Sequence, residues 1–76
     1  MQRIMFRSAE DDYCAMITAN AMESAGAGVF AITPHGTSTH DGALAPHQRF
    51  QVWAKVESDD KIAAVDAAIE REMNEC

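Results

Sequence analysis

The chain has 76 residues, which is the length of one small domain, and its formal net charge is −6. This charge argues against non-specific binding of the whole molecule to nucleic acid or to an anionic membrane. The hydrophobic fraction is 47%, but much of it is alanine, so the core is expected to be thin and self-association is a reasonable expectation.

The sequence predicts a protein of the cytoplasm that makes no membrane contact. No apolar run approaches the roughly 18 residues that a membrane helix needs, and no secretory signal is recognisable at the N-terminus. The two cysteines, Cys14 and Cys76, fall on different predicted elements, and reduced thiols are expected for both.

The first predicted strand covers residues 2–7, where apolar and basic side chains alternate. The core face is expected to carry Ile4 and Phe6, and the opposite face Arg3, Met5 and Arg7. Ser8 is then expected to cap a helix over residues 9–25, because several acids follow it in the first turn. Spacing of three and four places its apolar stripe at Tyr13, Met16, Ile17, Asn20, Ala21 and Ser24.

Residues 29–33 form a short apolar run that predicts a second strand, whose facing the pattern leaves open. Residues 34–47 contain two prolines and two glycines, so they are expected to form neither a helix nor a central strand. A loop of this length in a small domain is usually functional or disordered.

The strongest signal is the alternation over residues 49–57, which predicts the third strand. Phe50, Val52 and Val56 are expected to face the core, and Trp53 to face away from it. Ser58 is expected to cap a last helix that runs to about residue 74. The apolar stripe of that helix is expected at Ile62, Val65, Ile69 and Met73.

The predicted fold class is therefore α+β, with residues 1–76 in a single domain of order β-α-β-β-α. The simplest arrangement is a truncated ferredoxin-like fold, in which two helices cover one face of a three-stranded antiparallel sheet. The third strand would lie in the middle, and the first strand would be an edge that can accept a partner chain.

The uncovered face of this sheet is the predicted binding surface, because tryptophan and arginine are frequent anchors of protein interfaces. Its predicted partner-binding residues are Arg3, Met5, Arg7, Arg49, Gln51, Trp53 and Lys55. A protein partner, above all a second copy in a homodimer, is the favoured occupant. A solvated sheet face is the plain alternative, and nucleic acid is the least favoured because no aromatic motif of an RNA-binding sheet is recognisable.

Three histidines and an aspartate lie in or beside the long loop, namely His35, His40, Asp41 and His47. Imidazole and carboxylate groups suit transition metals, but this spacing matches no known ligand pattern and the intervening residues suggest mobility. No metal, cofactor or catalytic residue is therefore predicted, and the loop residues are kept as candidates for partner binding.

The stretch Val52-Trp53, the acidic Glu57-Ser58-Asp59-Asp60 and the alanine-rich last helix together resemble a family of short bacterial proteins. That family is described as putative signal-transducing proteins with a ferredoxin-like fold related to the nitrogen-regulatory P-II proteins. The boundary at Glu23-Ser24-Ala25-Gly26 fits the same layout, whereas Ala54 replaces the usual branched residue after Trp53. The resemblance implies a binding or regulatory module and no catalysis.

Three functions compete at this point. The first is a small non-catalytic regulatory or protein-binding module that acts through its open sheet face and long loop. The second is a small acidic inhibitor of the kind that phages encode, which blocks a host protein's nucleic-acid site. The third is a metal-binding protein that uses the loop histidines.

Overall fold

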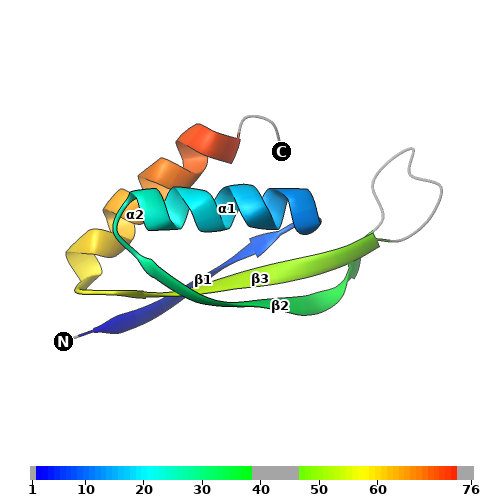
Figure 1. Ribbon diagram of the computed structural model, residues 1–76, viewed down its shortest axis with the longest axis horizontal. Helices are drawn as coiled ribbons and strands as arrows, with labels where there is room; N and C mark the ends of the chain where they lie inside the picture. The colour runs from blue at the N-terminus through cyan, green and yellow to red at the C-terminus, as the bar shows by residue number, and fades with distance from the viewer. Residues whose placement is uncertain (1, 39–46, 74–76) are drawn as a thin grey trace.

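The computed structural model describes residues 2–38 and 47–73. Five elements follow one another in the chain: β1 (Arg3–Ala9), α1 (Asp12–Ser24), β2 (Gly28–Ser38), β3 (His47–Val56) and α2 (Asp59–Glu72). Figure 1 shows the three strands crossing beneath the two helices. The predicted order β-α-β-β-α is confirmed.

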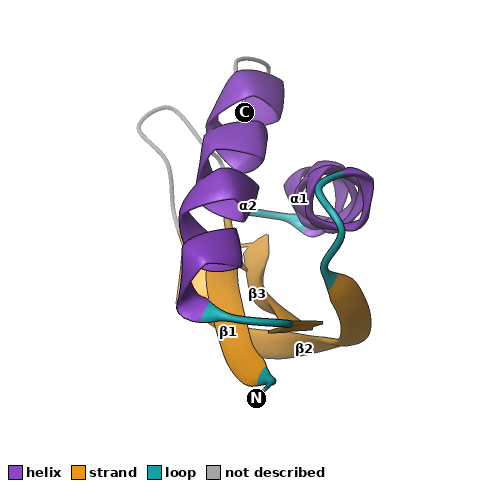
Figure 2. Cartoon of the chain, turned by 90° about the vertical axis from the view of Figure 1, so that its left-hand side faces the viewer, coloured by secondary structure: helices purple, strands orange, loops and turns teal. Residues whose placement is uncertain are grey.

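The three strands form one antiparallel sheet in the order β1-β3-β2, so β3 lies in the middle as predicted. Both helices lie on the same side of this sheet, and the other side is uncovered (Figure 2). We call the uncovered side the open face. This arrangement is the truncated ferredoxin-like fold that the sequence predicts.

The core lies between β3 and the two helices and is small. Val52, Ala54 and Val56 of β3 are buried there, together with Met22 of α1 and Val65 of α2. Many of the remaining core residues are alanines, which add little apolar area each. The predicted inward face of β3 is therefore confirmed.

The first helix begins later than predicted, and it buries a different face. β1 continues through Ser8, and Asp11 is the N-cap, whose side chain accepts a hydrogen bond of 2.8 Å from the backbone N–H of Cys14. The predicted stripe is wrong because Tyr13 and Met16 are exposed. The buried residues of α1 are Cys14, Ala15, Thr18, Ala19, Ala21 and Met22.

The second strand is longer than predicted, because it continues past Pro34 as far as Ser38. The expectation that the long loop begins at Pro34 is therefore wrong, although residues 34–38 lie in an edge strand and not in a central one. β2 is an edge strand, and a proline is tolerated on an edge because its missing N–H can face away from the ladder. The register also shifts between Pro34 and Thr37, which absorbs the irregular geometry.

The second helix agrees with its prediction. Ser58 is the N-cap, and Val65 and Ile69 are buried while Ile62 and Met73 pack against the core. Neither described helix is long and apolar enough to cross a membrane.

Cys14 differs from its expected state. It is buried in α1 and it is disulfide-bonded, so the reduced thiol that the sequence analysis expected is not what the structure contains.

Candidate functional site

The central strand supplies the polar and aromatic side chains of the open face. Because alternate residues of a strand point to opposite sides, the neighbours of buried Val52 and Ala54 must point away from the helices. These neighbours are Arg49, Gln51, Trp53 and Lys55. All four therefore lie on the open face, as predicted.

The facing predicted for β1 is wrong. Met5 is only 4% exposed and lies in the core, and Arg3 and Arg7 share its side of the strand. Ile4 and Phe6, the residues expected in the core, are 62% and 45% exposed on the open face. Three of the seven predicted binding residues, Arg3, Met5 and Arg7, are thus not on the open face.

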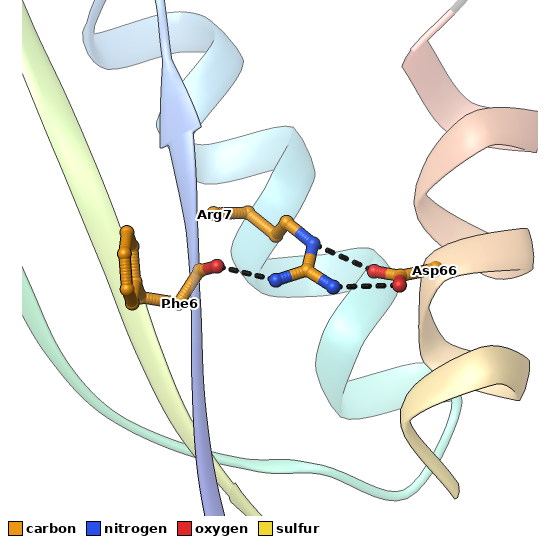
Figure 3. Close-up of polar contacts among 3 residues, drawn as sticks. All are labelled: Phe6, Arg7 and Asp66. Carbon is orange, nitrogen blue, oxygen red and sulfur yellow. Dashed lines mark hydrogen bonds and ion pairs between the residues drawn. The ribbon is translucent and has the colours of Figure 1, made fainter. Parts of the chain in front are cut away.

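Ion pairs with α2 account for the position of the two arginines. The Nε and Nη2 atoms of Arg7 donate to the two carboxylate oxygens of Asp66 over 2.7 and 2.6 Å (Figure 3). The Nε atom of Arg3 lies 3.2 Å from Oδ1 of Asp59, also in α2. A bidentate arginine–carboxylate pair has a fixed geometry, which favours the facing that brings Arg7 beneath the helix.

Arg7 also covers part of the sheet edge. Its Nη1 atom donates a 2.6 Å hydrogen bond to the backbone carbonyl of Phe6, as Figure 3 shows. This carbonyl belongs to β1, whose outer side has no neighbouring strand. The arginine therefore satisfies an edge acceptor that a partner strand could otherwise use.

The reversed facing of β1 places two aromatic rings side by side on the open face. Phe6 is directly opposite Trp53 in the register, and the two ring centroids lie 4.8 Å apart with a tilt of 32°. The indole N–H of Trp53 donates a 2.9 Å hydrogen bond to the hydroxyl of Thr33 on β2. Trp53 is thus fixed from both neighbouring strands.

A bulge in β2 adds a third aromatic ring to the same face. The register shifts between Val29, opposite Ala54, and Ala31, opposite Trp53, which leaves Phe30 as the extra residue. The Nζ atom of Lys55 lies 5.6 Å from the centroid of the Phe30 ring, a distance that fits a cation–π contact. The open face therefore carries an apolar row, which we define as Ile4, Phe6, Trp53 and Phe30.

Charges are divided between the two sides of the molecule. β1, β2 and β3 contain no aspartate or glutamate, whereas α1 and α2 together contain seven. Arg3 and Arg7 are paired with acids of α2, so Arg49 and Lys55 are the strand cations that remain on the open face. Neither of these two forms an ion pair with any residue in the described part of the chain. The open face is therefore apolar and basic, and the helix side is acidic.

The predicted histidine cluster is described only in part. His35 is exposed in β2, and His47 is the first residue of β3, opposite Ser38. His40 and Asp41 lie outside the described residues. Within the described ranges, no three His, Cys, Asp or Glu side chains lie close enough to hold a metal ion.

Ile4, Phe6 and Phe30 are the members of this site that sequence reasoning did not include. Alternation on β1 identified the two faces but not which one is buried. The pairing of Phe6 with Trp53 also depends on the register between strands that are far apart in the sequence.

Comparison of the chain with models of protein families, with curated proteins and with solved structures gives no match.

Proposed function

We propose that this chain is a small non-catalytic regulatory module that binds protein through its open face. The observation that carries the proposal is the apolar row, in which Ile4, Phe6 and Phe30 are each 45–62% exposed and the ring of Phe6 lies 4.8 Å from that of Trp53. Contiguous apolar surface of this kind commonly marks an interaction site, and aromatic residues are the usual energetic centres of such sites.

The surroundings of the row support a protein partner more than an anionic polymer. Among the described residues, Arg49 and Lys55 are the two unpaired cations that accompany the row, and the helix side of the molecule is acidic. Binding to nucleic acid gains most of its affinity from many phosphate contacts, which two cations supply poorly. The resemblance to putative signal-transducing proteins with a P-II-like fold agrees with a regulatory role and stays a prediction.

Affinity capture from cells that make the protein tests this function with a matched pair of variants. Ile4→Ser removes an apolar side chain that is 62% exposed on the open face, and Met16→Ser removes one that is equally exposed on α1. We expect the wild-type chain and Met16→Ser to capture the same protein, and Ile4→Ser to lose it. Equal capture by all three chains, or a loss confined to Met16→Ser, would refute the proposal.

A second candidate function is the acidic inhibitor, and the separation of charge is the observation that favours it. Acids concentrated on α1 and α2 could imitate the phosphates of a nucleic acid that a basic host protein binds. In that case capture would weaken steeply with salt and would depend on Asp60 and Glu70 rather than on Ile4. No observation favours the metal-binding alternative, since the described ranges bring no three His, Cys, Asp or Glu side chains together.

A cytoplasmic location remains part of the proposal, and the disulfide at Cys14 is the observation that weighs against it. Disulfides persist in oxidising compartments and are rare in the cytoplasm.

A further inference from the structure

We propose that the occupant of the open face is a second copy of this chain, packed face to face about a two-fold axis that lies across the strands at Trp53. This inference rests on the proposed function, because it takes the open face to be a protein interface and names its partner. The order of charges along the central stretch and the position of Trp53 in the sheet support this arrangement.

Trp53 lies at the centre of the open face. It pairs with Phe6 on one side and with Ala31 on the other, so its position is the midpoint across the three strands. Arg49, Gln51 and Lys55 share its face within β3, and Glu57 is the exposed residue that follows the strand, in the bend before α2. In the sequence, Trp53 lies midway between Arg49 and Glu57.

The residues at the two ends of this stretch have opposite charges. Arg49 lies four residues before Trp53, about 13 Å away along β3, and Glu57 lies four residues after it, one residue beyond the end of the strand. The proposed dimer takes Glu57 to continue the alternation of β3 onto the open face. A two-fold axis through Trp53, perpendicular to β3 and parallel to the sheet, exchanges these two ends. Arg49 of one copy then faces the partner's Glu57, and the symmetry produces this ion pair twice.

The same axis gives compatible neighbours at the other positions. Lys55 faces the partner's Gln51, which is neutral, and Trp53 and Phe6 each face their own counterparts in an apolar centre. The alternative two-fold axis, parallel to β3, would place Arg49 against the partner's Arg49 and Lys55 against the partner's Lys55. Like charges directly opposite one another oppose association, so the charge order selects the first axis.

The size of the face sets the expected strength of the dimer. Three strands spaced by about 4.8 Å and about ten residues long present a projected area of roughly 450 Å². Standard interfaces bury about 800 Å² of accessible surface per partner, so this face is smaller than a standard interface. We therefore expect a dimer that forms in the micromolar range rather than a permanent one.

Charge-reversal variants test the orientation of the two copies in the dimer directly. Their self-association is measured by analytical ultracentrifugation between about 1 and 100 µM. Arg49→Glu and Glu57→Arg should each weaken self-association at least about tenfold, because each one places like charges in contact. Mixing the two variants should restore association, since every pair across the mixed dimer is again opposite in charge. The double variant should dimerise like the wild-type chain.

Matched controls are available on the helix side. Lys61→Glu and Glu70→Arg make the same changes of charge at exposed positions of α2, and they should leave the association unchanged. Circular dichroism and the unfolding midpoint of each variant confirm that it is folded before its mass is interpreted.

Three results would overturn this inference, and they separate it from the proposed function. A wild-type monomer at 100 µM would remove the dimer while leaving the capture experiment to decide on another protein partner. A dimer weakened by Ile4→Ser but not restored by mixing the charge variants would retain the open face and reject the axis at Trp53. A dimer weakened by Met16→Ser and not by Ile4→Ser would refute both proposals.

Discussion

At the scale of single residues, the adjacent Val52 and Trp53 of the central strand lie on opposite faces of the sheet. Val52 is fully buried under the helices, and the adjacent Trp53 is held on the open face by Phe6 and Thr33. Neighbouring residues on this strand therefore belong separately to the core and to the proposed binding surface. Substitution of one should leave the role of the other largely intact.

The stability role of this position can be measured by Val52→Ala. Removing two methyl groups from a fully buried side chain should lower the free energy of unfolding by about 1–3 kcal/mol. Thr33→Val is a useful comparison, because it keeps the side-chain volume and removes the acceptor for Trp53. Chemical denaturation followed by circular dichroism measures both, and a change below about 0.5 kcal/mol for Val52→Ala would contradict its burial in the core.

The oxidation state of Cys14 is a second prediction at this scale. Because Cys14 is disulfide-bonded, we expect it not to react with a maleimide in denaturant until a reductant is added. The denaturant removes the protection that burial alone would give. Peptide mapping identifies the labelled residue, and labelling of Cys14 without reductant would show that the thiol is free.

At the scale of elements, the sequence was most informative where apolar and polar residues alternate over a long stretch. β3 and α2 were predicted with their correct faces, because large apolar residues recur there with a clear period. In α1 the buried residues are mostly alanine, threonine and cysteine, while Tyr13 and Met16 are exposed. A stripe assigned by the size of apolar residues therefore identified the wrong face.

The error on β1 has a different cause. A strand with period two has two faces, and both faces of β1 carry apolar residues: Met5 and Ala9 on one, Ile4 and Phe6 on the other. Tertiary contacts determine which face of β1 is buried. These contacts are the pairing of Arg7 with Asp66 and the register that brings Phe6 to Trp53. Neither contact is visible in a local pattern, so Ile4 and Phe6 could not be assigned to the open face from the sequence.

The edge of β1 gives a prediction for Arg7→Ala. Loss of the half-buried bidentate pair with Asp66 should cost about 1 kcal/mol of unfolding free energy. The same variant leaves the Phe6 carbonyl without its hydrogen bond on an unprotected edge, so we expect slow aggregation at high concentration. Unfolding midpoints and light scattering over time measure the two effects.

Arg3→Ala is the matched control, since Arg3 makes a longer and more exposed contact with Asp59 and donates no hydrogen bond to a carbonyl of the β1 edge among the described residues. It should change the unfolding free energy by less than about 0.5 kcal/mol. Equal behaviour of the two variants in both measurements would mean that Arg7 does not protect the edge.

At the scale of the whole molecule, the fold separates two surfaces with opposite character. One side consists of α1 and α2 with their acids, and the other is an open sheet with aromatic rings and two unpaired cations. A chain of 76 residues with a small, alanine-rich core leaves its sheet half covered. A partner on the open face would bury apolar area that the chain cannot bury alone.

The most direct test of this account is a dilution series followed by two-dimensional NMR of the backbone amides and the indole N–H of Trp53. We expect the resonances that move with concentration to cluster on the open face, at Ile4, Phe6, Phe30, Trp53 and Lys55, while those of Tyr13 and Met16 stay fixed. Movement confined to α1, or spectra that do not change between the lowest and the highest concentration, would contradict self-association through the open face.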